Sequence, residues 1–105
     1  FKEGEIASII AKEEWFKQTG AHNRDCEDAL DMVMSIAVVK IAFFVRVVNG
    51  ISRISLRSKG KIDVAKIAAV FEGGGHFNAA GCSIDTLDVE KAKQIVLKEI
   101  FEVYK

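Results

Sequence analysis

An Asn49-Gly50 pair between two strand-like segments is the feature that most restricts how this 105-residue chain can fold. Asn-Gly is the strongest short signal for a two-residue type I′ turn, whose twist matches that of the strands it joins. The preceding segment, Val38 to Val48, is almost continuously apolar, as in a strand buried on both faces. The following segment, Ile51 to Ser58, alternates apolar and polar residues. We therefore predict an antiparallel hairpin beside a central strand.

The two-residue turn also fixes which side chains share a face of the hairpin. Val48 faces Ile51, and counting back gives three further opposed pairs on one face: Arg46 with Arg53, Phe44 with Ser55, and Ala42 with Arg57. The other face must be the drier one, because it carries Phe43, Val45, Ile54 and Leu56. Two directly opposed arginines cost a few tenths to about 1 kcal/mol unless water or an anion relieves them. Near a hairpin tip, solvent is the simpler answer.

The rest of the chain predicts one α/β domain. Its signals are a strand at Gly4 to Ile10, a helix at Lys12 to Thr19 ended by Gly20, a helix from an N-cap at Asp25 to about Ile36, a helix capped by Asp63 and running through Phe71, a glycine loop, a strand at Gly81 to Ile84, and a helix from Asp88 to about Tyr104. The apolar stripe of the last helix comprises Val89, Ala92, Val96, Ile100 and Val103. We expect a mixed sheet of about four to five strands, containing the hairpin and flanked by helices.

Composition limits the classes of function. Half of the residues are apolar, and the chain contains no proline and no internal repeat, so residues 1–105 form one domain with one core. Fifteen basic and fifteen acidic residues cancel, which argues against a non-specific duplex binder but permits a local phosphate site. No apolar run approaches 18 residues and no signal peptide is visible, so we expect a cytoplasmic segment without membrane contact. Cys26 and Cys82 should be free, buried thiols. Because the chain opens on Phe1, we expect it to be a piece of a longer protein.

Three consecutive glycines and a histidine, Gly73-Gly74-Gly75-His76, form the most distinctive polar motif. Glycine loses the most backbone entropy on folding, so three in a row need a reason. Backbone N–H groups gathered around an anionic oxygen are one such reason, with the histidine as an added donor. A tight loop whose glycines only supply positive φ is the other. The motif alone leaves both explanations open.

Arg57 is the second candidate for an anion contact. The hairpin register puts it away from the tip and beside a central strand, where a guanidinium without a partner would be costly. A carboxylate of the same chain is one possible partner. A phosphate is the sharper interpretation, because the planar fork of arginine suits bidentate capture.

These motifs together resemble a known family. The pattern Ser55-Leu56-Arg57-Ser58-Lys59, then Asp63-Val64, Ile67-Ala68, the glycine–histidine motif and Ala79-Ala80-Gly81 resembles the C-terminal DHH-associated domain, first subfamily, of the DHH phosphoesterases. It is most similar to the NrnA-type bifunctional oligoribonuclease and PAP phosphatase enzymes, with RecJ exonucleases and cyclic-di-AMP phosphodiesterases as relatives. The resemblance covers roughly Gly4 to the end. One departure is Glu72, which stands where that family often has a fourth glycine and whose carboxylate would repel a nearby phosphate.

The resemblance implies a substrate-binding lobe of a two-lobed hydrolase. The residues it assigns to substrate phosphate and sugar are Arg57, Ser58, Gly73, Gly74, Gly75, His76 and, more weakly, Asn78. An N-terminal DHH lobe of the same chain would hold two divalent ions, with manganese expected, on Asp and His side chains. The present chain has no D-H-H cluster, and its His22 and Cys26 make only two potential ligands. We therefore expect no catalytic residue, metal or other cofactor in it, and an inactive fragment on its own.

Three alternatives remain open on sequence grounds. The parent protein could be a cyclic-dinucleotide phosphodiesterase rather than an enzyme for short RNA or 3′,5′-phosphorylated adenosine. The chain could also be a non-catalytic nucleic-acid-binding module, as the related domain of alanyl-tRNA synthetases resembles a tRNA-contacting element, although neutral charge weighs against this. Finally, it could be a structural or dimerising domain in which Arg57 pairs internally.

Overall fold

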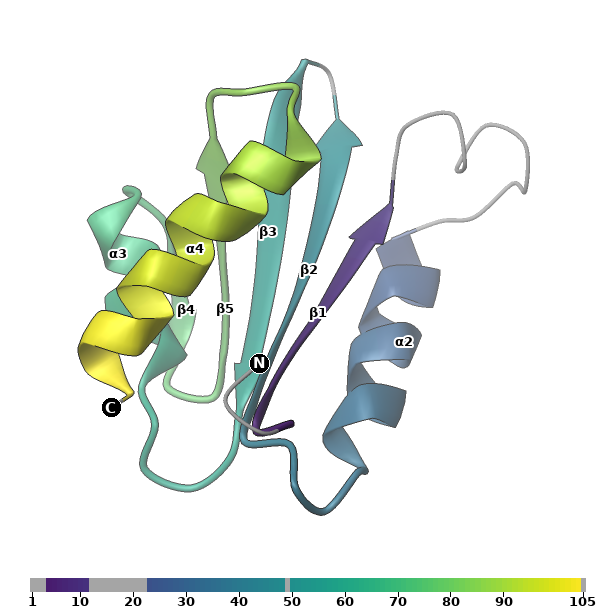
Figure 1. The fold of residues 1–105 in the computed structure, drawn as a ribbon, viewed down its shortest axis with the longest axis vertical. Helices are drawn as coiled ribbons and strands as arrows, with labels where there is room; N and C mark the ends of the chain where they lie inside the picture. The colour runs from purple at the N-terminus through teal and green to yellow at the C-terminus, as the bar shows by residue number, and fades with distance from the viewer. Residues whose placement is uncertain (1–3, 12–22, 49, 105) are drawn as a thin grey trace.

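The fold is a five-stranded mixed sheet with helices on both faces, in a computed structural model that describes residues 4–11, 23–48 and 50–104. Along the chain the elements are β1 (Ile6–Ala11), α2 (Asn23–Met34), β2 (Ile41–Val48), β3 (Ile51–Ser58), α3 (Val64–Val70), β4 (Gly74–His76), β5 (Ala79–Ile84) and α4 (Val89–Val103). The strand order is β1-β2-β3-β5-β4, with β1 parallel to β2 and the other pairs antiparallel (Figure 1). The predicted α/β fold class is confirmed. None of the helices within the described ranges is long and apolar enough to cross a membrane.

The central hairpin has the predicted register. Val48 pairs with Ile51, and Ala42 pairs with Arg57 at the far end. Gly50 has a φ of +84°, in the left-handed region that the predicted turn requires, whereas Asn49 lies outside the described residues. β2 begins at Ile41, three residues later than predicted, because Val38 lies in the turn that follows α2.

The drier face of the hairpin carries the main core, as predicted. Phe43, Val45 and Leu56 are fully buried, and Ile54 is nearly so. These side chains pack against α3 and α4, which contribute Val64, Ile67, Ala68, Val89, Ala92, Val96, Leu97 and Ile100. Val103 is an exception to the predicted apolar stripe of α4, since it is 38% exposed at the last turn of the helix.

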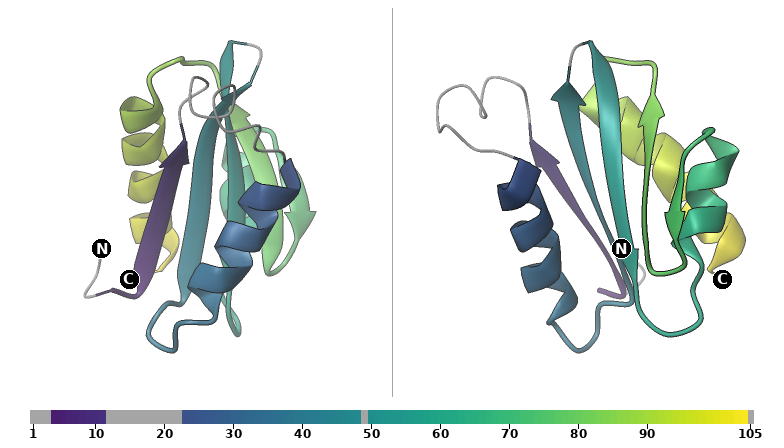
Figure 2. Two further views of the ribbon diagram at one scale, coloured as in Figure 1. Left: turned by 90° about the vertical axis from the view of Figure 1, so that its right-hand side faces the viewer. Right: turned by 180° about the vertical axis from the view of Figure 1, so that it is seen from behind.

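α2 covers part of the opposite face. Its Leu30 is fully buried against Ala42 and Phe44 of β2. The helix begins at Asn23, so the prediction of Asp25 as its N-cap is wrong. Asn and Asp are about equally good at starting helices, and the earlier of the two positions is used. The helix predicted at Lys12 to Thr19 lies outside the described residues. Figure 2 shows α2 on one side of the sheet and α4 on the other.

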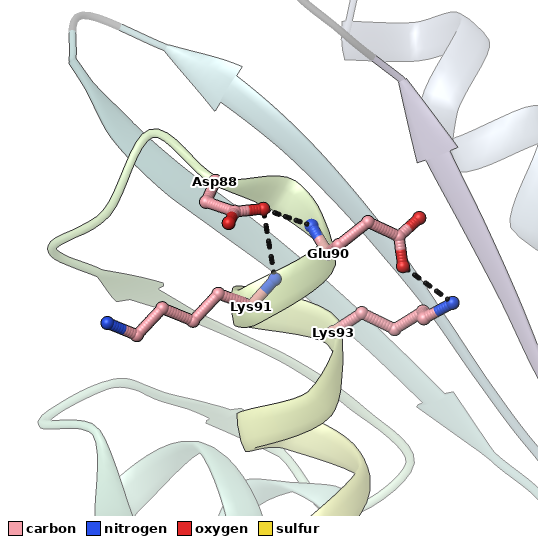
Figure 3. Close-up of polar contacts among 4 residues, drawn as sticks. All are labelled: Asp88, Glu90, Lys91 and Lys93. Atoms are coloured by element: carbon pink, nitrogen blue, oxygen red, sulfur yellow. Dashed lines mark hydrogen bonds and ion pairs between the residues drawn. The ribbon is translucent and has the colours of Figure 1, made fainter.

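The last helix is fixed at both ends. The Asp88 carboxylate accepts hydrogen bonds from the backbone N–H groups of Glu90 and Lys91 at 3.1 and 3.2 Å, which is the predicted N-cap (Figure 3). Glu90 also forms an ion pair with Lys93 at 3.0 Å. At the other end, the Tyr104 hydroxyl donates to the Glu5 carboxylate, and this hydrogen bond raises the pKa of Tyr104. The contact joins the end of α4 to the residue before β1.

Candidate functional site

The glycine motif forms a strand rather than a loop. β4, Gly74–His76, pairs antiparallel with β5, and the two are joined by a turn at Phe77 and Asn78. The prediction of a loop followed by a strand from Gly81 is therefore wrong on two points, because β5 begins at Ala79. Glycine has low strand propensity, so a Gly-Gly-His strand gives no signal of its own; its backbone is held by pairing with β5.

The three glycines are required for different reasons. A Cβ on Gly73 would lie 2.2 Å from the Gly81 carbonyl oxygen, and one on Gly75 would lie 2.6 Å from the Ala79 carbonyl oxygen. Gly75 also has a φ of +147°. By contrast, Gly74 has no positive φ, and a Cβ there would meet nothing within 4 Å. The fold therefore explains Gly73 and Gly75, but it does not require glycine at position 74.

Glu72 occupies a position that favours glycine. Its φ of +61° is left-handed, immediately after the last turn of α3. The Glu72 N–H donates to the Ala69 carbonyl at 3.1 Å and the Gly73 N–H to the Ala68 carbonyl at 2.9 Å, which is the Schellman pattern of a helix C-terminus. Most residues adopt this conformation at a cost, and glycine does not. The exposed Glu72 side chain stands where the family resemblance would place a fourth glycine.

Arg57 and His76 lie in one row across the sheet. Arg57 pairs with Ala79 of β5, and Ala79 pairs with His76 of β4. Directly paired residues project from the same face, so the two side chains flank the small Ala79, with their backbones about 10 Å apart. Sequence reasoning missed Ala79, whose only signal was its place between the glycine motif and Gly81.

The Arg57 guanidinium is half-buried and partly held by the chain itself. Its Nη1 donates to the Leu56 carbonyl oxygen at 3.0 Å. Burial lowers the pKa of Arg57 from its ordinary value of 12.5, so the partly desolvated charge gains from a further anionic partner. His76 is exposed. The pair therefore combines a preorganised cation with an accessible imidazole.

The sheet face that carries this row is uncovered over β3, β5 and β4. α2 packs on the β1–β2 half of the face, whereas α3 and α4 pack on the other side of the sheet (Figure 2). The residues that the register places on the uncovered part of the face are Arg53, Ser55, Arg57, Ala79, Gly81, Ser83, Gly74 and His76. None of these is acidic, and each is at least partly exposed. A ligand can therefore approach them without displacing a described element.

Ser58 and Asn78 lie elsewhere. Ser58 is on the opposite face and buried, where its hydroxyl donates to the Ile62 carbonyl at 2.5 Å and accepts from the Asn78 amide at 2.9 Å. The same amide donates to the Gly60 carbonyl at 3.2 Å. These bonds tie the end of β3 and its following loop to the β4–β5 turn. The substrate contacts that the resemblance implies for these two residues stay a prediction.

Cysteine and metal chemistry add little to the site. Cys82 is free and buried, as predicted, whereas the side chain of Cys26 and all of His22 lie outside the described part of the chain. Burial raises the pKa of Cys82 to about 11, an effect that the nearby Arg53 charge partly offsets. Within residues 4–11, 23–48 and 50–104, no group of three or more His, Cys, Asp or Glu side chains could hold a metal ion.

Known proteins match the chain over most of its length. The bifunctional oligoribonuclease and PAP phosphatase NrnA of Thermus thermophilus is 30% identical over 78 residues, which are 74% of this chain and 24% of that protein. An exopolyphosphatase-related protein of Bacteroides fragilis superposes with a TM-score of 0.87 at 29% identity, over 97% of this chain and 30% of its own. The C-Ala domain of Aquifex aeolicus alanyl-tRNA synthetase shares the fold, with a TM-score of 0.66 and 13% identity over 90% of this chain and 88% of its own.

These matches also set the scale of the chain. It spans about a quarter of the length of the Thermus relative and 30% of the Bacteroides protein. The model of the DHHA1 domain family matches residues 6–104, a range that contains the whole sheet, α4 and the site. The chain therefore belongs to the DHHA1 domain family of DHH phosphoesterases.

Proposed function

We propose that this domain binds a phosphate group of a short oligoribonucleotide or nucleotide phosphate and presents it to a separate catalytic lobe. Gly74 is the observation that carries the proposal. It lies one strand step from His76 on the same uncovered face, and neither sterics nor its φ requires glycine there. A missing side chain at an open position allows close approach of a ligand to the backbone, which is how phosphate oxygens reach N–H groups.

The proposed division of roles follows from exposure and charge. Arg57 supplies a fixed, partly desolvated cation, His76 supplies an accessible donor, and Ala79 leaves space for the phosphate between them. Gly73 and Gly75 hold β4 tightly against β5 so that Gly74 can face the ligand. Zero net charge is consistent with a local site rather than an extended duplex interface.

Catalysis is proposed to require a part of the protein that this chain does not contain. Two-metal hydrolysis needs clustered ligands that activate water, and the described residues offer none. By analogy with the longer relatives, a DHH lobe would supply them. The present chain alone is expected to release no product from short oligonucleotides or nucleoside bisphosphates with added manganese. Turnover that a chelator abolishes would contradict this division of labour.

Steady-state kinetics of the full-length protein tests the binding roles. Arg57→Ala and His76→Ala should each reduce kcat/KM on a short substrate by about 10- to 100-fold, the effect of losing a desolvated contact worth about 1.5–3 kcal/mol. Metal content and thermal unfolding should stay unchanged. Lys98→Ala, an exposed cation of α4 in the layer behind the sheet, is the matched control and should behave as wild type. Wild-type activity in both site variants would reject the phosphate site.

A further inference from the structure

A second basic row lies on the same face, closer to the hairpin tip. Arg46 of β2 pairs directly with Arg53 of β3, and Arg53 pairs with Ser83 of β5. Arg46 is half-buried and Arg53 is exposed. No hydrogen bond or ion pair joins either guanidinium to another described residue. Like charges directly opposed across a ladder repel, so an anion placed between these side chains would relieve a cost already present in the fold.

The spacing of the two basic rows matches a nucleotide chain. Arg53 and Arg57 are four residues apart on β3 with Ser55 between them, which places the rows about 13–14 Å apart. Successive phosphorus atoms of a nucleotide strand are separated by as many covalent bonds as alternate Cα atoms of a β-strand. An extended nucleotide chain along β3 therefore advances by one phosphate for every two residues.

The row between the arginines offers room rather than charge. It contains Ser55 and Gly81, with Gly74 beyond them on β4. A hydroxyl and two glycines leave space for a sugar and its phosphate. Inorganic tripolyphosphate fits this spacing poorly, because its phosphorus atoms are separated only by single bridging oxygens and its third phosphate cannot reach the second arginine row.

We propose that Arg46 and Arg53 form a second phosphate subsite, which binds the third phosphate of a short single-stranded oligonucleotide whose first phosphate lies between Arg57 and His76. The inference rests on the proposed function and adds a dependence on length. Substrates with one or two phosphates reach only the Arg57 row and the Ser55 row. Substrates with three or more also contact the arginine pair.

Kinetics of the full-length, metal-loaded protein on 5′-phosphorylated mono-, di-, tri- and tetranucleotides tests this dependence. Arg53→Gln should lower kcat/KM by about 3- to 10-fold for the tri- and tetranucleotide, as expected for one partly solvated charge contact. It should leave the mono- and dinucleotide within twofold of wild type. The dependence of log(kcat/KM) on log[salt] for the trinucleotide should become shallower by about 0.7, the value for one lost phosphate contact in a single strand.

Three further arms separate the possible results. Arg53→Lys keeps the charge and should recover most of the activity, and Lys98→Ala controls for general loss of positive charge. Inhibition by tripolyphosphate should be unchanged in Arg53→Gln. Equal effects of Arg53→Gln on all lengths, no effect on any length, or weaker inhibition by tripolyphosphate would each overturn the second subsite. Arg57→Ala, measured in parallel, should impair every length, so its failure would reject the first phosphate site independently.

Discussion

Arg57 and His76 come from different strands but occupy the same row of the sheet, with Ala79 between them. Ala79 is half-buried, and its single methyl group is the only side chain that the register places between the two. A larger residue there should fill the proposed phosphate position. We expect Ala79→Leu in the full-length protein to lower kcat/KM on a short substrate by about tenfold or more, because it blocks ligand approach.

The matched control for this change is Ala69→Leu, an identical substitution at an exposed position of α3. Both variants should unfold within about 1 kcal/mol of wild type, since neither enters the packed core. Wild-type kinetics in Ala79→Leu would mean that substrate does not pass between Arg57 and His76.

Glu72 offers a test of backbone strain. Its left-handed φ of +61° follows α3, where glycine is favoured. Glu72→Gly should raise the unfolding free energy by about 1 kcal/mol, because left-handed backbone costs about 1–2 kcal/mol per ordinary residue and glycine returns part of this as added entropy of the unfolded chain. Glu72→Gln removes the charge without relieving the backbone and should not stabilise. Urea denaturation compares the two, and equal stability of both variants would exclude strain as the cause.

Asn78 should matter for stability first. Its amide joins Ser58 to the Gly60 carbonyl, so Asn78→Ala should lower the unfolding free energy by about 1–2 kcal/mol. KM on a short substrate, measured where the variant is still folded, decides the additional role that the family resemblance implies. A raised KM would support a substrate contact, whereas an unchanged KM would remove Asn78 from the site.

Cys82 predicts a specific dependence of stability on pH. Burial raises its pKa from 9.0 to about 11 in the folded chain, with the Arg53 charge acting in the opposite direction. The folded state therefore holds the thiol proton more tightly than the unfolded state. The resulting stabilisation is complete below pH 9 and is lost as the pH rises toward about 11. The stability difference between wild type and Cys82→Ala should shrink over that interval in denaturation curves. A constant difference would show that the thiol is not desolvated.

The hairpin could be predicted from the sequence because its signals are local. Asn49-Gly50 sets the turn, and alternation from Ile51 onward sets the faces, so the pairing of Ala42 with Arg57 followed by counting. Asp63 and Asp88 were recognisable N-caps for the same reason. The start of α2 was not, because Asn23 and Asp25 are competing caps within one turn.

The candidate site needed long-range information. β4 has two glycines and a histidine, which carry no strand signal, and its place at the sheet edge depends on pairing with β5. The pairing of Arg57 with Ala79 joins segments separated by α3. Sequence reasoning therefore identified Arg57 and His76 individually, but it did not predict that one small residue separates them.

Gly74→Ala is the most direct measurement of the central claim, that this glycine serves a ligand rather than the fold. A Cβ there meets nothing within 4 Å, so the unfolding free energy should stay within about 0.5 kcal/mol of wild type. Gly73→Ala, whose Cβ would lie 2.2 Å from the Gly81 carbonyl oxygen, should be strongly destabilised in the same assay. In the full-length protein, Gly74→Ala should reduce kcat/KM on a short phosphorylated substrate by about tenfold, because the methyl group keeps phosphate away from the backbone. Unchanged stability with wild-type kcat/KM would contradict the account and leave the glycines as a purely structural edge strand.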